Sequence, residues 1–446
     1  MKLGVLCVGF PNFRYDAAQQ ITERAQQLLR GMPGVELAGG PRVLIDEQEI
    51  QKEIRALAAQ KPDLLLLELG TYSYGSVILT CLEELGNTPI VLWGFREPEL
   101  PGFTGLALNS LCALNMYTSF LHRLGRRDTP YLYGDPDEPA VRQQLSRVLQ
   151  AAGIRAALRR ARFCVVGGRV PGFYLSNVDE LRFRQAVGPE LVYCSLAELL
   201  AAAQQVDADV LAAEQAHVRS IVPCIEADAQ TLEKTCRLTA ALRAYAQKNG
   251  ISAFALKCWP DFQDLYGIAV CGVVSVLNND GLLVSCEGDI PGLTTMYMLQ
   301  RLTKLPVFLT DLVNIAADGT LKLWHCGSAA PALAAPGCTA CFTRHPTMTY
   351  VPGIGMDLAL RPGRLVAAKL SEGEPCRLLV FSGECVPSAH PMRGNPGDIR
   401  LDGSPEALLD TIVREGIEHH YCIAYDADAG VLRELCRLCG YQLLEG

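Results

Sequence analysis

Two carboxylates lie at the ends of two consecutive strand-like segments, and their spacing suggests a site that could do chemistry. Glu287 follows the apolar run 282–286, and Asp311 follows the apolar run 307–310. The segment 291–304 between them begins with Pro-Gly and predicts a helix. A strand, a helix and a strand in this order predict a parallel unit whose strand ends meet at one edge, about 5 Å apart. We therefore expect the two carboxylates to lie side by side.

Two carboxylates at this separation repel each other, so a divalent cation or a shared proton must neutralise the pair. A metal ion between Glu287 and Asp311 is the simpler interpretation. The alternative is that both acids only cap the helices that follow their strands, as acidic residues near helix starts often do. The spacing alone leaves both interpretations open.

The histidines offer further ligands for a metal. Among seven histidines, His419 and His420 are adjacent, and adjacent residues of a strand face opposite ways, so one of them can point into a site. His325 ends a strand shortly after Asp311 and could line the same cleft, although a histidine satisfied by its strand-end neighbours is an equal alternative. Carboxylate oxygens with imidazole nitrogens suit Mn²⁺, Mg²⁺ or Co²⁺ better than structural zinc. Such a metal can chelate a polyol.

Composition and charge exclude several classes of partner. The chain has 446 residues, of which 49% are hydrophobic and 20% charged, enough for two or three domains with sizeable cores. A net charge of −8 and the absence of a basic patch argue against nucleic-acid and anionic-membrane partners. No window reaches the roughly 20 apolar residues of a membrane span, and the first residues read as a buried strand instead of a leader. We expect a cytoplasmic protein.

The pattern of strands and helices predicts an α/β fold with three domains. Residues 1–155 alternate apolar strands with helical stretches, which is typical of a doubly wound α/β domain. Residues 156–302 repeat this pattern and carry Glu287. Residues 303–446 have short strands with Gly and Pro turns, which predict a β-rich, barrel-like domain that carries Asp311 and the histidine pair. The fold class is thus two doubly wound, Rossmann-like α/β domains followed by a β-rich domain.

Eighteen cysteines are scattered through the chain, and we expect them to be reduced and mostly buried. Two CxxC pairs, Cys338 with Cys341 and Cys436 with Cys439, could together supply four thiolates to a structural zinc ion. The alternative for the second pair is the core face of an amphipathic helix at 431–439, because i, i+3 spacing also gives such a face.

Short segments along most of the chain, strongest after residue 250, carry a family resemblance. They are Lys257-Cys258-Trp259-Pro260, Cys286-Glu287-Gly288-Asp289-Ile290, Leu309-Thr310-Asp311, Trp324-His325-Cys326-Gly327 and Glu418-His419-His420. Through them the chain resembles the superfamily of L-fucose isomerase and L-arabinose isomerase, which are ketol isomerases with two α/β domains and a β-rich C-terminal domain.

The resemblance implies roles for particular residues. Glu287 and Asp311 would bind the metal and also act as the catalytic acid and base, and His420 would be the remaining protein ligand, with His419 as the alternative. The implied metal is Mn²⁺, with Mg²⁺ or Co²⁺ possible. The substrate would contact three further side chains, those of Lys257, Trp259 and His325.

The implied function is an intramolecular oxidoreductase, a metal-dependent aldose-ketose isomerase that transfers a proton through a cis-enediol. Its small-molecule substrate would be an unphosphorylated sugar, either fucose-like or arabinose-like or a sulfonated hexose, since no anion-binding loop for a phosphate stands out. The resemblance also implies a homo-oligomer, a hexamer or another trimer-based assembly, in which Trp93 or Asn109 would complete a neighbour's site. The alternatives are a non-catalytic sugar-binding or regulatory protein and another metal-dependent sugar enzyme, an epimerase or an aldolase.

Overall fold

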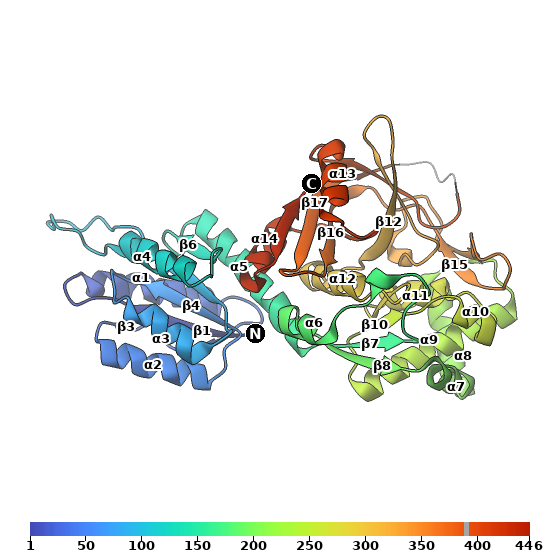
Figure 1. Cartoon of the computed structure of the whole chain (residues 1–446), viewed down its shortest axis with the longest axis horizontal. Helices are drawn as coiled ribbons and strands as arrows, with labels where there is room; N and C mark the ends of the chain where they lie inside the picture. Colours follow the sequence, from blue (N-terminus) through green and yellow to red (C-terminus); the bar gives the residue numbers. More distant parts are fainter. Residues whose placement is uncertain (388–391) are drawn as a thin grey trace. The chain divides into compact units, whose positions relative to one another are not determined.

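The computed structural model describes residues 1–387 and 392–446, and the chain divides into two compact units. The first unit comprises Met1–Ala156 together with Gly430–Gly440, and the second comprises Ala157–Ala429 together with Tyr441–Gly446. Figure 1 labels their helices and strands. The return of a C-terminal segment to the first unit carries no signal in the sequence, and the predicted division into three domains stays a prediction.

The first unit is built on a parallel sheet with helices on both sides (Figure 1). Its central strands are apolar along their whole length and buried, as strands covered on both faces must be. In sheet order the strands are β2 (Glu36–Ala38), β1 (Lys2–Val8), β4 (Leu64–Leu69), β5 (Ile90–Gly94) and β6 (Tyr131–Tyr133), with β3 (Val43–Leu44) paired to β1. The helices are α1 (Tyr15–Arg30), α2 (Glu47–Ala59), α3 (Ser76–Leu85), α4 (Ser110–Arg123), α5 (Pro139–Arg160, which runs on into the second unit) and most of α14 (Ala429–Cys439).

The second unit begins with another parallel sheet. Its order is β11 (Leu283–Ser285), β10 (Ala253–Leu256), β7 (Arg162–Val166) and β8 (Glu190–Cys194). Its helices are α6 (Glu180–Ala186), α7 (Leu196–Gln204), α8 (Ala208–Ile221), α9 (Ala229–Asn249), α10 (Asp261–Tyr266), α11 (Cys271–Asn279) and α12 (Ile290–Thr303). A small sheet of β9 (Cys224–Ile225), β14 (Cys341–Arg344) and β15 (Ile354–Asp357) adjoins them.

A closed antiparallel β-barrel completes the second unit. The ring runs through β16 (Gly363–Ser371), β19 (His420–Tyr425), β12 (Phe308–Ile315), β13 (Leu321–Trp324), β18 (Gly397–Leu401) and β17 (Arg377–Val386), and β17 pairs with β16 to close it. Strand β20 (Gln442–Glu445) extends β17, and α13 (Pro405–Glu415) precedes β19. Closure pairs strands that would otherwise be free edges. The predicted mixture of parallel α/β sheets with a barrel-like C-terminal part is thus confirmed.

Helix α12 holds the parallel sheet and the barrel together. Each of its residues from Ile290 to Leu299 is buried, as expected for a helix that is covered all round. It packs against β10 and β11 on one side and against β16 and β19 on the other. Figure 1 shows α12 between β10 and β16. The N-terminus of α12 therefore lies where the two sheets meet.

The predicted parallel unit around α12 is wrong. Strand β11 belongs to the parallel sheet, whereas β12 belongs to the barrel and pairs antiparallel with β13 and β19. Asp311 also lies inside β12 instead of after its end, because the strand continues to Ile315 to form a hairpin with β13. The apolar run is a strand, as predicted, but its partner β19 is distant in sequence and leaves no local signal.

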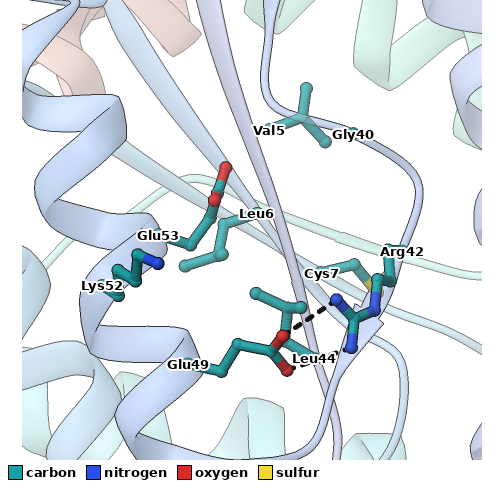
Figure 2. Close-up of a pocket in the computed structure, with 9 residues that line it drawn as sticks. All are labelled: Val5, Leu6, Cys7, Gly40, Arg42, Leu44, Glu49, Lys52 and Glu53. Atoms are coloured by element: carbon teal, nitrogen blue, oxygen red, sulfur yellow. Dashed lines mark hydrogen bonds and ion pairs between the residues drawn. The ribbon is translucent and has the colours of Figure 1, made fainter.

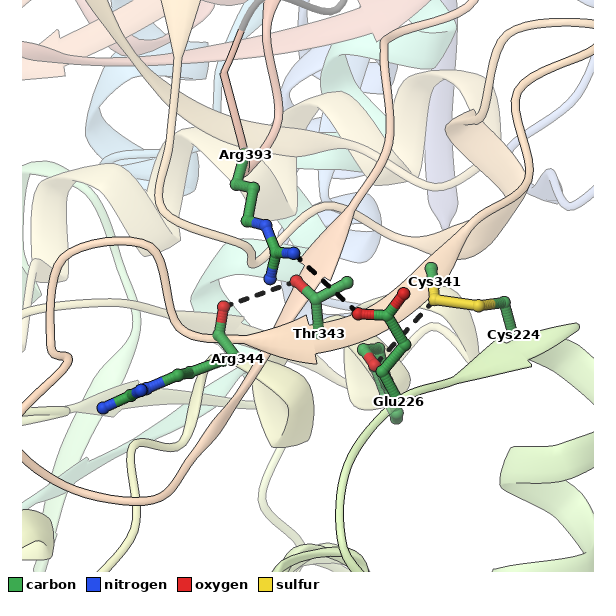
Figure 3. Close-up of a disulfide and its surroundings, with 7 residues drawn as sticks. Cys224, Glu226, Cys341, Thr343, Arg344 and Arg393 are labelled. Carbon is green, nitrogen blue, oxygen red and sulfur yellow. Dashed lines mark hydrogen bonds and ion pairs between the residues drawn. A yellow bond between two sulfur atoms is a disulfide. The ribbon is translucent and has the colours of Figure 1, made fainter.

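Two further expectations need correction. Cys341 forms a disulfide with Cys224 that joins β14 to β9 (Figure 3), so it cannot join Cys338 and the second CxxC pair in a four-thiolate zinc site. Most of the other sixteen cysteines are buried, as expected. Trp93 is fully buried in the first unit and donates its indole N–H to the Gly134 carbonyl at 2.9 Å, so it cannot reach a neighbour's site.

Within the described residues, no helix is both long enough and apolar enough to cross a membrane.

A buried carboxylate in the first sheet yields a prediction on stability. Glu68 lies in β4 between Cys7 and Trp93 and is fully buried, and within the described residues neither of its carboxylate oxygens has a hydrogen-bond partner. Burial raises the pKa of Glu68 to about 8. The folded chain therefore holds a proton that the unfolded chain releases near pH 4.5, so stability is lost as pH rises toward 8.

We expect Glu68→Gln to remove this loss, because the amide stays neutral. Its stability advantage over the wild type should grow by about 2 to 4 kcal/mol between pH 5 and pH 8, at about 1.4 kcal/mol for each pH unit. Urea unfolding at both pH values measures it. The control is Glu83→Gln at an exposed position of α3, whose effect should be the same at both. An equal effect of Glu68→Gln at both pH values would contradict the prediction.

Candidate active site

Glu287 lies in the tight turn that leads from β11 into α12. Its φ of 60° is left-handed, a conformation that non-glycine residues adopt rarely and at a cost. Its backbone N–H donates to the Cys258 thiol at 3.4 Å, and the N–H of Gly288 donates to the Leu256 carbonyl at 3.0 Å. The indole of Trp259 donates to Glu287 Oε1 at 3.0 Å. These contacts leave Oε2 of Glu287 to face the histidine pair.

Asp311 and His420 are brought together by the barrel. The register of β12 and β19 places them directly opposite each other, and opposite residues share one face of a sheet. His420 Nε2 lies 3.7 Å from Asp311 Oδ1 and 3.3 Å from Glu287 Oε2. The carboxylates thus reach one histidine nitrogen from two different sheets, and not from adjacent ends of one sheet.

Asp289 fixes the orientation of His420. Its Oδ2 accepts a hydrogen bond from His420 Nδ1 at 2.9 Å and lies 3.4 Å from Lys369 Nζ of β16, and its Oδ1 caps α12 by accepting the N–H of Gly292 at 2.8 Å. The side chains of Asp289, Lys369 and His420 are 4%, 1% and 4% exposed, so little water competes for these contacts.

The roles of Asp289 and Lys369 were not predicted from the sequence. An Asp followed by a helix with Pro at its start is an N-cap signal, but the cap does not reveal the contact with His420. Lys369 in an otherwise apolar buried strand signals a buried acidic partner without saying which one.

The charges of the cluster support one another. Burial alone would raise the pKa of Asp289, but the charge of Lys369 and the hydrogen bond from His420 hold it well below its usual range. Burial would also raise the pKa of Glu287, but hydrogen bonds from His419, His420 and Trp259 hold this pKa well below its usual range. Burial disfavours a charged His420, yet Asp289 and Glu287 raise its pKa to about 10. The carboxylates of Asp289 and Glu287 are therefore ionised.

The remaining predicted residues lie at different distances from this cluster. His419 is 60% exposed, and its Nε2 is 4.0 Å from Glu287 Oε2. His325 is buried, with its ring 6.0 Å from that of His420 and its Nδ1 3.1 Å from the Ser328 hydroxyl. Lys257, by contrast, forms an ion pair with Asp261 at 2.8 Å.

A loop from the parallel sheet lies against the same turn. Gly288 has a φ of 66°, and a Cβ there would lie 2.7 Å from the Gly168 carbonyl oxygen, so the loop passes too close for any side chain. On that loop, the Phe173 ring packs edge-on against Trp259 at 5.7 Å and against His419 at 6.0 Å. The segment 167–176 thus adjoins the predicted substrate side of Glu287.

The donor set fits a hard divalent metal ion. Asp311 Oδ1 is buried and has no hydrogen-bond partner among the described residues, which is costly unless a ligand satisfies it. The ligand atoms of Asp311, His325 and His420 lie within 4.8 Å of one another, and so do those of Glu287, His419 and His420. Ligands about 2.1 Å from one ion lie about 3 Å apart, close to the separations around His420 Nε2. Asp289 then supplies the outer hydrogen bond that a metal-bound histidine needs.

A pocket in the first unit offers no comparable set. It is lined by Val5, Leu6, Cys7, Gly40, Arg42, Leu44, Glu49, Lys52 and Glu53 (Figure 2). Arg42 pairs with Glu49 there at 2.9 Å, so these two charged groups neutralise each other. The pocket does not gather carboxylates around a histidine.

Comparison with known proteins identifies relatives along nearly the whole chain. No family model matches. The chain is 28% identical over 437 residues to a protein named sulfoquinovose isomerase from Alkalicoccus urumqiensis, covering 97% of this chain and 96% of that protein. A sulfoquinovose isomerase from Priestia aryabhattai is 27% identical over 435 residues, with 97% and 96% covered, and one from Clostridium sp. (strain MSTE9) is 26% identical over 429 residues, with 95% and 94% covered.

These relatives are isomerases that are named for a sugar, and they confirm the prediction of an enzyme of the isomerase class. A solved solute-binding protein of an ABC transporter from Agrobacterium vitis, bound with alpha-D-tagatopyranose, is 13% identical. It covers 64% of this chain and 81% of its own at a TM-score of 0.17, which is too low to support an argument. The resemblance to the fucose and arabinose isomerases stays a prediction.

The buried contact of Asp289 with Lys369 yields a prediction on folding. We expect Lys369→Met to lower the free energy of unfolding by about 3 to 5 kcal/mol, because removing one partner of a buried ion pair leaves a charge that burial penalises. Urea unfolding measures the loss. Adding Asp289→Asn to Lys369→Met should recover part of it, and this double variant tests the pairing itself.

The control for Lys369→Met is Arg414→Met, which removes an exposed ion pair with Asp410 and should cost less than about 1 kcal/mol. Equal effects of the two single variants would contradict the assignment of Asp289 and Lys369 as an interacting buried pair.

Proposed function

We propose that the chain is a metal-dependent aldose-ketose isomerase that acts on a sulfonated sugar through a cis-enediol. The observation that carries the proposal is the position of His420 Nε2, 3.3 Å from Glu287 Oε2 and 3.7 Å from a buried Asp311 oxygen that has no hydrogen-bond partner among the described residues. The full-length similarity to proteins named sulfoquinovose isomerase supports the reaction and the class of substrate.

Glu287, Asp311 and His420 would hold the metal, and the donor chemistry favours Mn²⁺, with Mg²⁺ or Co²⁺ as substitutes. When bound, such an ion supplies a Lewis acid that polarises the carbonyl of the open-chain sugar and stabilises charge on its O1 and O2 oxygens.

The protein side chains carry the proton transfer. One of the two carboxylates, Glu287 or Asp311, removes the proton from C2 of the aldose as a general base, and a proton is returned at C1. The intermediate is a cis-enediol of the sugar. Trp259 holds Glu287 through Oε1, so that Oε2 is free to face the substrate, and Asp289 keeps the His420 ring from rotating. His325 and Trp259 lie where they can contact the sugar.

The test is ketose formation from a panel of aldoses by metal-stripped protein resupplied with Mn²⁺. The panel contains L-fucose, D-arabinose, L-arabinose and sulfoquinovose. We expect turnover of sulfoquinovose that requires the metal, and Glu287→Gln and Asp311→Asn should lower kcat by about 10²- to 10⁴-fold, the usual contribution of general acid-base catalysis.

The matched control is Asp318→Asn in the exposed turn after β12, which should leave turnover unchanged. Full activity without a metal would contradict metal dependence. A Glu287→Gln enzyme that kept both its metal and full turnover would refute the assigned role of Glu287, and the lack of any ketose would refute the reaction.

A sulfonated substrate needs a cation near the site, and we propose Arg169. The other nearby cations are engaged, since Lys369 pairs with Asp289 and Lys257 pairs with Asp261. Among the described residues, Arg169 has no acidic partner, and its guanidinium lies 4.6 Å from the ring centre of Tyr174. It belongs to the loop that touches Gly288, next to Glu287. A planar guanidinium can donate two hydrogen bonds to a sulfonate.

We expect Arg169→Met to lower kcat/KM for the sulfonated sugar by about 10- to 100-fold, the value of a hydrogen bond to a charged group. The corresponding 6-deoxyhexose without the sulfonate should change less than threefold. Arg182→Met, which removes an exposed arginine of α6, is the control and should leave both values unchanged. An equal loss for the two sugars would show that Arg169 supports the loop and does not recognise the anion.

A further inference from the structure

Four cysteines lie beside the candidate active site, and the proposed isomerisation uses none of them. Cys258 follows β10, Cys271 begins α11, Cys286 follows β11 and Cys326 follows β13. Cys258, Cys271 and Cys286 are buried, and Cys326 is half-buried. The thiols of Cys271 and Cys326 approach to 3.6 Å, across 55 residues of sequence.

A buried histidine contacts this thiol pair, and its hydrogen bonds define the tautomer of its ring. His345 is 1% exposed, and its Nδ1 accepts a backbone hydrogen bond from Met348 at 2.9 Å. Nδ1 therefore carries a lone pair, and the proton of the neutral ring is on Nε2. Nε2 lies 3.2 Å from the Cys271 sulfur and so donates to it. On the other side of the pair, the Cys326 sulfur lies 3.4 Å from His325 Nδ1.

This hydrogen-bond pattern distinguishes thiol chemistry from metal binding. The ligand atoms of Cys271, Cys326 and His345 are close enough to surround an ion. A metal-bound histidine, however, presents a bare nitrogen to the ion and donates from its other nitrogen. His345 does the opposite, because its outer nitrogen accepts from Met348 and its inner nitrogen holds the proton. His345 is therefore arranged to donate a hydrogen bond to the Cys271 sulfur and not to bind a metal.

Cys271 and Cys326 differ in the pKa of the thiol and in exposure, as the two members of a redox-active pair do. A hydrogen bond from Cys271, together with His325 and His345, holds the pKa of Cys326 below its usual range although burial opposes this. Cys326 is also the more exposed of the two, so a small oxidant can reach it. Two cysteine sulfurs 3.6 Å apart, one of them partly exposed, are placed to form a disulfide on oxidation.

We propose that Cys271 and Cys326 are a redox-active dithiol that a hydroperoxide converts into a disulfide. In the first step the Cys326 thiolate attacks the peroxide, the O–O bond breaks, one oxygen becomes the sulfenic acid of Cys326 and the other leaves as water after protonation. In the second step the Cys271 sulfur attacks the sulfenic sulfur, the S–S bond forms and a second water leaves. Two thiols are oxidised, one hydroperoxide is reduced, and two molecules of water result from hydrogen peroxide.

The pair is connected to the candidate active site through one residue. Cys326 directly follows His325, whose ring packs against His420 and whose ligand atoms lie close to those of Asp311. Drawing the Cys326 sulfur from 3.6 Å to the roughly 2.05 Å of a disulfide changes its contact with His325 Nδ1. We expect the disulfide form to have lower isomerase activity. This effect on activity rests on the proposed function, whereas disulfide formation itself does not.

The experiment treats the full chain with hydrogen peroxide at a few equivalents, blocks the free thiols with iodoacetamide and maps the peptides by mass spectrometry. We expect the loss of two thiols for each chain and a cross-linked peptide pair containing Cys271 and Cys326, both reversed by dithiothreitol. Cys271→Ser and Cys326→Ser should each abolish the cross-link. Cys112→Ser, which removes the only cysteine that is exposed among the described residues, should preserve it.

A second control is Cys164→Ser, which removes a thiol of another buried pair, Cys164 with Cys194, and should also preserve the cross-link. Oxidation confined to Cys112 would overturn the proposal. It would also be overturned if one equivalent of zinc stayed with the purified chain and Cys271 and Cys326 reacted only after chelation. If the disulfide forms but neither the reduced nor the oxidised chain has isomerase activity, the proposed dithiol stands and only the proposed function is refuted.

Discussion

The buried carboxylate of Asp289 is the point on which the candidate site depends. It caps α12, pairs with Lys369 of β16 and accepts a hydrogen bond from His420 of β19, so one side chain ties the helix to two barrel strands. Each of these charges would be costly to bury alone, and together they compensate one another. The positions of His420 Nε2, and through it of Glu287 and Asp311, follow from this arrangement.

Much of the fold was predictable because its signals are local. Apolar runs between helical stretches define the strands of both parallel sheets, and short strands with Gly and Pro turns predict the barrel-like part. The pairing of distant strands was not predictable in the same way. Asp311 was placed at the end of a parallel strand, whereas the structure makes β12 a barrel strand that lies beside β19, more than a hundred residues later.

The candidate site was likewise predictable in part, since residue types are visible in the sequence and distant contacts are not. Glu287, Asp311 and His420 were singled out by residue type and by the family resemblance, and the structure brings them together. Asp289 and Lys369 were missed, because a cap signal and a lone lysine in an apolar strand do not say which residues they contact. The roles of Cys271, Cys326 and His345 were hidden for a related reason, since they come from three separate elements that only the folded chain brings together.

The long separation between Asp289 and His420, 131 residues, has a consequence for biosynthesis. Strand β19 is synthesised well after α12 and its capping carboxylate, because it follows them by more than a hundred residues. Until β19 pairs with β12, Asp289 lacks its contact with His420, and the barrel cannot close. Contacts of this range form late and slowly. If the proposed ligands Glu287, Asp311 and His420 hold a cation, their complete set therefore exists only after β19 has been synthesised and has paired with β12.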